Sequence, residues 1–422
     1  MMPEVSFGGL LVVAAIAVGA PLLVGLAPAI RVPAVVLEIV AGIVVGPSLL
    51  GWVEPDLPIE ILGLVGLAFL LFLAGLEIDL ERLRGRPLKL AGGGYLLTLA
   101  IGLPVGLAFT GAGLATNPLL VALMLSATSL GLIVPILKDS GQVDRDLGQL
   151  TLASASVADF AAVLLLSFLF SQTDASPAGK LILLALFAAV IVLVALTILR
   201  LERWMRLGAV LTRLEDTTAE IRVRLAVVLL VGFTALAGRV GLETILGAFL
   251  AGAILSLTDR DAMAHPQFRA KLEAIGYGFL IPVFFVSSGL RFDLEALLET
   301  PAALARLPLF LAALLLVRGV PALLYRPVLG RRGATVAALL QATSLPFIVT
   351  AAEIGVSVGA IEPVTGAGLV AAGLLSVVVF PLVATGLLRR QDAEQASSAG
   401  GPPAVRAADR GPAGRGSCPP GA

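Results

Sequence analysis

Apolar runs of about 20 residues recur along this chain from near Phe7 to Leu388, and that length is what a membrane-spanning helix needs. An α-helix rises 1.5 Å per residue, so about 20 residues cross the ~30 Å hydrocarbon core of a bilayer. Of the 422 residues, 58% are hydrophobic and 14% are charged, which leaves too few charges to cover a soluble domain. A membrane barrel would alternate apolar and polar residues, and these runs do not. We therefore expect an all-α polytopic membrane protein.

The apolar runs and their polar breaks predict thirteen membrane spans. If the N-terminus lies outside, the inner loops and the final flank hold 21 basic residues and the outer loops hold four. Because basic residues concentrate on the cytoplasmic side, this imbalance predicts an external N-terminus and a cytoplasmic C-terminus. The approximate extents of the spans are 6–27, 33–51, 58–76, 88–110, 118–138, 148–171, 179–199, 221–240, 243–257, 274–290, 303–325, 333–354 and 361–388.

The polar segments of the chain exclude several classes of function. Residues 391–422 are rich in Ala, Gly, Pro and Ser, and we expect a disordered cytoplasmic tail after a transmembrane domain of residues 1–390. The only histidine, His265, and the only cysteine, Cys418, lie in polar stretches, so cysteine-held metals are excluded. An intramembrane enzyme would need a nucleophile–base pair or metal ligands at depth. We expect no catalytic residue, no cofactor and no nucleic-acid partner.

The tetrapeptide Ala-Thr-Ser-Leu occurs twice, at 127–130 and 342–345, and each copy lies halfway through an expected span. A helix breaker adjoins each copy, Gly131 in the first case and Pro346 in the second. The two copies fall in the fifth and twelfth spans, and an odd separation of seven makes those spans cross the membrane in opposite directions. Matching interruptions in oppositely directed spans predict an inverted-topology repeat, a feature of many secondary transporters.

The two interruptions also match in depth. Thr128 and Thr343 each lie about ten residues into their spans, or ~15 Å deep at 1.5 Å per residue. Backbone groups freed at the bilayer midplane must meet protein or a water-filled cavity rather than lipid. Mid-span packing or kinking is the alternative interpretation of such residues. We predict a binding site framed by two broken, crossed helices at Thr128, Ser129, Thr343 and Ser344.

Asp159 lies about eleven residues into the sixth span, where a carboxylate costs at least ~2.5 kcal/mol. Burial favours its protonated form and a nearby cation favours its charged form, so one Asp can alternate between binding a proton and binding a cation. Ser156, three residues earlier, lies on the same helical face and could add an oxygen ligand. The alternative is a structural Asp tied to the broken backbone.

Arg318 lies near the middle of the eleventh span, some ten residues from either edge. Arginine stays protonated at physiological pH, so Arg318 is expected to be a fixed charge that pairs with a carboxylate or with carbonyls of the broken helices. Snorkelling to the membrane surface is the alternative.

The remaining acidic residues near the spans are weaker candidates. Glu38 lies a turn or two from the inner face, and Glu243 and Glu353 lie near outer helix ends. We treat these three as possible accessory ion residues. Glu77 and Asp79 are interpreted as charges at the inner end of a helix.

Four sequence blocks, in this order, resemble the monovalent cation:proton antiporter superfamily, the sodium/proton exchanger domain, over roughly residues 10–388. The similarity is to the bacterial branch that includes potassium-efflux and sodium/proton antiporters. The blocks are LEIVAGIVVGPSLLG at 37–51, LLFLAGLE at 70–77, LGAFLAG at 246–252 and PVFFVSSGL at 282–290.

This resemblance implies a homodimer in a bacterial plasma membrane that exchanges Na⁺ or K⁺ for H⁺ by an elevator mechanism. It implies a mobile core around spans five, six, eleven, twelve and thirteen, and a dimerising panel made of the remaining spans. Asp159 resembles the essential Asp of the family, where a monovalent cation is the only metal bound. Arg318 resembles its basic residue on the later helix.

The sequence departs from the family pattern at Ala158, where relatives usually carry Asp, Asn or Gln. Alanine offers no ligand or titrating group, so we expect one proton per monovalent cation and hence electroneutral exchange. The choice between Na⁺ and K⁺ stays open. A sodium-coupled symporter of an organic anion, which can share this inverted-repeat fold, is the alternative.

Overall fold

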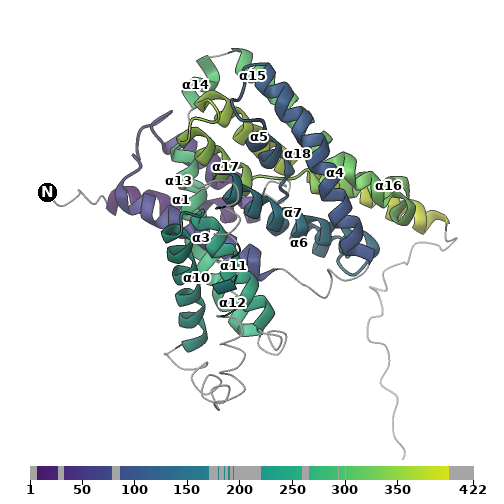
Figure 1. Ribbon diagram of the computed structural model, residues 1–422, viewed down its shortest axis with the longest axis horizontal. Coiled ribbons are helices and arrows are strands. Elements are labelled where there is room, and N and C mark those ends of the chain that lie inside the picture. Colours follow the sequence, from purple (N-terminus) through teal and green to yellow (C-terminus); the bar gives the residue numbers. More distant parts are fainter. Residues whose placement is uncertain are drawn as a thin grey trace, which may run out of the picture.

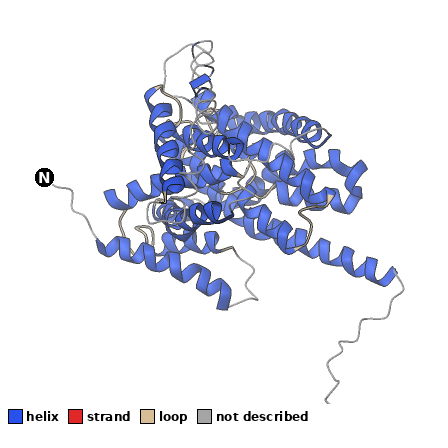
Figure 2. Cartoon of the chain, turned by 90° about the horizontal axis from the view of Figure 1, so that it is seen from below, coloured by secondary structure: helices blue, strands red, loops and turns tan. Residues whose placement is uncertain are grey.

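The computed structural model describes most of the chain as helix. Within the described ranges no strand occurs, and the β-type pairing is a lone bridge between Ala115 and Ile361 (Figure 2). Eight helices there are long and apolar enough to cross a membrane. The prediction of an all-α polytopic membrane protein is confirmed. The described residues are 7–26, 33–77, 86–170, 220–258, 266–292, 294–299 and 301–398, with a few isolated positions between 179 and 193.

The helices form two groups that pack mainly among themselves. In the first group, α3 packs against α11 and α13, α2 against α13 and α1, and α10 against α11. This group occupies the lower left of Figure 1. Its elements are α1 (Phe7–Leu26), α2 (Ala34–Val45), α3 (Leu57–Leu76), α10 (Ile221–Arg239), α11 (Thr244–Thr258), α12 (Pro266–Ile275), η2 (Gly276–Leu280) and α13 (Ile281–Leu290).

The second group contains both tetrapeptides and occupies the top and right of Figure 1. In it, α4 packs against α5 and α7, α16 against α7, and α15, α16 and α17 against α18. Its elements are α4 (Arg86–Gly111), α5 (Pro118–Ser126), α6 (Leu130–Asp139), α7 (Asp146–Phe170), α14 (Leu294–Glu299), α15 (Pro301–Leu314), η3 (Leu315–Gly319), η4 (Val320–Tyr325), α16 (Arg326–Gln341), α17 (Pro346–Ser357) and α18 (Pro363–Ser398).

The expected spans coincide with these helices wherever the structure describes the chain. The fifth span is divided into α5 and α6, and the twelfth is divided between α16 and α17. The expected span at 179–199 lies almost wholly outside the described residues, as do Asp79, His265 and Cys418. Gly330 separates the eleventh and twelfth spans, with a φ of 69° that favours glycine over residues with a Cβ.

Two features differ from the sequence-based expectation. The first is α18, which continues to Ser398 and so makes residues 391–398 helical, although the expected tail began at 391. Ala, Glu and Gln in this stretch are good helix formers, and they extend a helix that is already nucleated.

The second difference is α4, which we expected among the panel spans and which instead packs with the helices expected for the core. Gly106 lets α4 approach the start of α5, because a Cβ at this position would overlap the carbonyl oxygen of Pro118. Small residues occur in nearly every span, so the sequence does not show which partner such a glycine faces.

Glycines also hold the first group together at the contact between α3 and α11. A Cβ at Gly252 would overlap the Phe72 carbonyl oxygen, and a Cβ at Gly75 would overlap the Phe249 carbonyl oxygen. Each helix therefore presents a glycine to the backbone of the other, and the two backbones touch. This contact fixes α3, which ends at the cavity described below.

We expect Gly252→Ala to lower the free energy of unfolding by about 1–3 kcal/mol, because the added methyl group forces the two backbones apart. The measurement is the thermal unfolding midpoint of the purified protein in detergent. Gly232→Ala in α10 is the matched control, since a Cβ there meets no atom within 4 Å. Equal midpoints for the two variants would contradict the proposed contact.

Candidate functional site

The two interrupted helices meet at their breaks and supply hydrogen-bond partners to each other. The Ser129 backbone N–H donates to the Thr343 carbonyl oxygen at 2.9 Å. The Thr128 hydroxyl donates to the Gln341 carbonyl oxygen at 2.8 Å. Because α5 and α16 both stop at these positions, the carbonyl groups would otherwise lack partners at membrane depth. The breaks are therefore one crossing point, as the repeated tetrapeptide predicted.

The ends of the same two spans show that they run in opposite directions. Thr116, just before α5, donates its backbone N–H to Ala360, just after α17, at 3.0 Å. The Thr116 hydroxyl donates to the same carbonyl oxygen at 2.9 Å. The beginning of the fifth span thus adjoins the end of the twelfth, which confirms the antiparallel arrangement expected from the span count.

Asp159 lies on α7 beside this crossing. Its Oδ1 atom accepts a hydrogen bond from the Thr128 backbone N–H at 3.3 Å. The helix α6 begins at Leu130, two residues after Thr128. The partial positive charge at its N-terminus favours a carboxylate beside it, such as that of Asp159. Asp159 is partly exposed, because it forms part of a cavity wall. The structure therefore holds the carboxylate at the crossing with one side facing the cavity.

Arg318 is fully buried on the other side of Thr128. Its Nε donates to the Thr128 hydroxyl oxygen at 2.7 Å, and its Nη1 donates to the Thr98 hydroxyl oxygen on α4 at 3.2 Å. Its Nη2 has no hydrogen-bond partner among the described residues. Thr128 thus contacts Asp159 through its backbone and Arg318 through its side chain. The partners of Arg318 are hydroxyl oxygens, so the expected pairing with a carboxylate or with carbonyls of the broken helices is wrong. The snorkelling alternative is also wrong, because the side chain is fully buried.

The cavity beside Asp159 has a volume of about 60 Å³, enough for an ion with a few water molecules. Its walls come from both helix groups and are mostly apolar, and the polar side chains among them all carry oxygen. The lining residues are Leu70, Leu71, Ala74, Glu77, Thr128, Ser129, Leu130, Asp159, Val163, Phe249, Tyr277, Pro346 and Phe347. Carboxylate, hydroxyl and carbonyl oxygens are the ligands that hard cations prefer.

Several predicted site residues lie outside this cavity wall. Ser156 is buried on α7, and Thr343 and Ser344 are buried at the second break. Thr343 contributes the carbonyl group described above, and Ser344 exchanges hydrogen bonds with Ser376 on α18 through its backbone. Thr343 and Ser344 therefore support the second break, and the cavity lining contains none of the three residues.

The three accessory acids are also absent from the cavity lining. Glu38 is buried on α2, and Glu353 lies on α17. Glu243 precedes α11, and its backbone N–H donates to the Ser167 hydroxyl oxygen at 3.1 Å.

Gln341 is a site residue that the sequence reasoning missed. It is fully buried, and its side-chain Oε1 accepts a hydrogen bond from the Ser154 hydroxyl on α7 at 3.1 Å. Its backbone carbonyl accepts from Thr128. Gln341 therefore ties α7 to the second break. The available signal was its position, an amide directly before the second tetrapeptide inside an apolar span.

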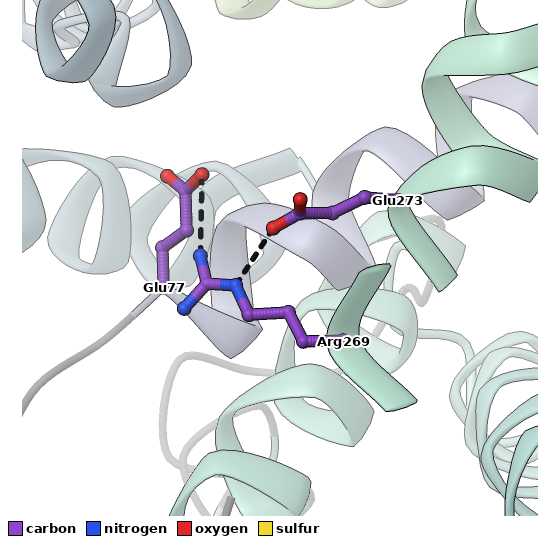
Figure 3. A network of polar contacts seen from close by, with 3 residues as sticks. All are labelled: Glu77, Arg269 and Glu273. Carbon is purple, nitrogen blue, oxygen red and sulfur yellow. Dashed lines mark hydrogen bonds and ion pairs between the residues drawn. The ribbon is translucent and has the colours of Figure 1, made fainter. Parts of the chain in front are cut away.

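Glu77 was interpreted as a helix-end charge, and it does follow the last residue of α3, but it also lines the Asp159 cavity. Its side chain is 15% exposed, and its Oε1 lies 3.8 Å from Nη2 of Arg269 on α12 (Figure 3). Burial raises the pKa of the Glu77 carboxyl to about 7, and the Arg269 guanidinium opposes that rise. The charge of Glu77 near neutral pH therefore depends on the Arg269 guanidinium.

Comparison with known proteins gives a consistent result. Residues 14–390 match the family model described as sodium/hydrogen exchanger, transmembrane. Over 407 residues the chain is 30% identical to YjbQ of Bacillus subtilis (strain 168), covering 93% of this chain and 64% of that protein, so it spans less than two thirds of that relative. Over 273 residues it is 31% identical to the Na⁺/H⁺-K⁺ antiporter GerN of Bacillus cereus, covering 63% of this chain and 67% of GerN.

A solved structure has the same fold. The sodium proton antiporter MjNhaP1 of Methanocaldococcus jannaschii, determined at pH 8, superposes with a TM-score of 0.62 at 18% sequence identity. The superposition covers 90% of this chain and 97% of that one. At 18% sequence identity, this match shows that the two proteins share a fold.

We expect Thr128→Val to destabilise the protein by about 1–3 kcal/mol, because the buried Arg318 Nε loses its acceptor and the Gln341 carbonyl loses its donor. The thermal unfolding midpoint in detergent measures this effect. Thr110→Val is the matched control, because the Thr110 hydroxyl bonds only a carbonyl of its own helix, that of Gly106, at 3.0 Å. A midpoint no lower than that of the control would contradict the bridging role of Thr128.

Proposed function

Since the chain belongs to the sodium/hydrogen exchanger family of cation/proton antiporters, we propose that it exchanges Na⁺ or K⁺ for H⁺ at Asp159. The observation that carries this proposal is the Asp159 carboxylate, held by the Thr128 backbone at the crossing of two broken helices and exposed to a small cavity that Thr128, Ser129 and Glu77 also line. Such a carboxylate binds either a proton or a monovalent cation, and both cannot occupy it together.

The neighbouring groups fit a single exchanging carboxylate. Thr128 and Ser129 line the cavity and are the proposed oxygen ligands, while Thr343 and Ser344 support the crossing from behind and Ser156 is buried on α7. Arg318 lies behind Thr128, so its fixed positive charge stabilises the site without filling the cavity. Ala158 is fully buried and adds no titrating group beside Asp159, and the other carboxyl group of the cavity, that of Glu77, belongs to the first helix group.

The cavity position favours an elevator mechanism. Its walls combine α3, α11 and η2 of the first helix group with the breaks and α7 of the second. Sliding of the second group against the first would carry Asp159 between the two membrane faces and leave the crossing intact. We propose that the first group is the static panel, that it forms a homodimer in a bacterial plasma membrane, and that the N-terminus lies outside and the C-terminus inside.

The organic-anion symporter alternative is less well supported. A cavity of about 60 Å³ is small for an organic anion, and drug-sized ligand pockets run to several hundred Å³. The ionisable carboxyl groups that line the cavity belong to Asp159 and Glu77, whereas Arg318 is covered by Thr128. An acidic lining attracts cations and repels carboxylates.

We expect Asp159→Asn to abolish cation-dependent proton movement in proteoliposomes loaded with a pH-sensitive dye, because Asn keeps the size of the side chain and removes its exchanging charge. Na⁺ and K⁺ are tested separately, which also identifies the transported cation. Asp146→Asn is the matched control, because Asp146 is exposed in the first turn of the same helix. Exchange in the Asp159 variant equal to that of the control would disprove the assignment.

We also expect exchange to be electroneutral, since one carboxylate gives one proton per monovalent cation. Dye-loaded proteoliposomes receive a membrane potential of either sign from a thiocyanate gradient, at a fixed cation gradient. The initial exchange rate should be the same for both signs. A rate that rises for one sign and falls for the other would show net charge movement and contradict the single-carboxylate stoichiometry.

A further inference from the structure

Glu77 connects the interior of the Asp159 cavity with its exterior. Its Oε2 atom is buried and has no hydrogen-bond partner within the described part of the chain. Its Oε1 faces Arg269, whose side chain is 46% exposed. The carboxyl group therefore lies between the Asp159 cavity, which it lines, and a solvent-accessible guanidinium outside the cavity lining. We call this position the cavity mouth.

Arg269 is shared between two carboxylates, as Figure 3 shows. Its Nε donates to the Glu273 Oε1 at 2.7 Å, one turn along α12, while its Nη2 lies 3.8 Å from the Glu77 Oε1. Glu273 is 41% exposed and lies outside the cavity lining. Arg269 can therefore leave Glu77 and keep its shorter contact, so the longer contact costs little to break.

The two carboxyl groups of the cavity belong to different helix groups. Glu77 follows α3 of the first group, and Asp159 lies on α7 of the second. A cation that enters past Arg269 meets Glu77 first, because the Glu77 carboxyl contacts Arg269 and also lines the cavity that contains Asp159. Until a cation arrives, Arg269 supplies the positive charge that stabilises the Glu77 carboxylate.

We propose that Glu77 and Arg269 form a charge gate at the cavity mouth, in which the transported cation competes with the Arg269 guanidinium for the Glu77 carboxylate. This inference rests on the proposed exchange at Asp159. Glu77 attracts the entering cation, and Arg269 sets the concentration at which that cation displaces it. The gate therefore determines the apparent affinity for the cation, while Asp159 remains the group at which cation and proton exchange.

The test measures the half-saturating cation concentration for dye-detected exchange in proteoliposomes, at constant ionic strength with choline as the replacement ion. We expect Arg269→Gln to lower this concentration about two- to five-fold, the range that corresponds to loss of a partly exposed ion pair. We expect Glu77→Gln to raise it by a similar factor, because the entering cation loses its first carboxylate.

Lys271→Gln is the matched control for Arg269→Gln. It removes one positive charge from the same helix, but Lys271 pairs with Glu220 at 3.0 Å and does not line the cavity. We expect its half-saturating concentration to equal that of the wild type. A decrease as large as that of Arg269→Gln would show a general effect of surface charge and overturn the gate.

The double variant Glu77→Gln/Arg269→Gln separates competition from independent effects. With the Glu77 carboxylate gone, removal of Arg269 should change the half-saturating concentration no further. A full additional decrease would overturn the proposal. Size-exclusion profiles in detergent check that each variant is folded. Cation-induced shifts of the thermal unfolding midpoint should rank the cation affinities of the variants in the same order, without a transport assay.

The outcomes also distinguish this inference from the proposed function. Wild-type protein that shows no cation-dependent proton movement would disprove exchange itself. Wild-type exchange with unchanged half-saturating concentrations in both single variants would disprove the gate alone.

Discussion

Backbone groups at membrane depth need hydrogen-bond partners, and this requirement explains the centre of the structure. Two helices stop in the middle of their spans, and each break supplies what the other lacks. The Ser129 N–H meets the Thr343 carbonyl oxygen, and the Thr128 hydroxyl meets the Gln341 carbonyl oxygen. Neither interruption would be stable alone in hydrocarbon, so the two broken helices act as one structural unit.

The crossing also separates the two buried charges. Thr128 contacts Asp159 with its backbone and Arg318 with its side chain, so one residue fixes both positions. Arg318 is enclosed by α4 and the first break, whereas Asp159 borders the cavity. A fixed cation behind the site reduces the cost of a buried carboxylate and leaves that carboxylate accessible.

The cavity lies where the two helix groups meet, and its composition follows from that position. Glycine contacts between α3 and α11 hold Glu77 on the first group, and the crossing holds Asp159 on the second. Movement between the groups would change the separation of these carboxylates. In the proposed mechanism, the relative position of the two groups therefore controls ion access.

The sequence by itself determined the all-α membrane class, the two breaks, their opposite directions and the candidates Asp159 and Arg318. These features follow from local rules, since bilayer thickness sets span length and a buried charge or a broken helix is costly wherever it occurs. Tertiary structure alone decided that Gln341, Thr98 and Glu77 join the site, and that α4 packs with the second helix group. Those outcomes depend on which helix faces meet, and small and polar residues at helix faces do not specify their partners. Glu77 shows the difference most clearly, because its neighbour Arg269 lies on a helix far along the chain and only folding brings the two together.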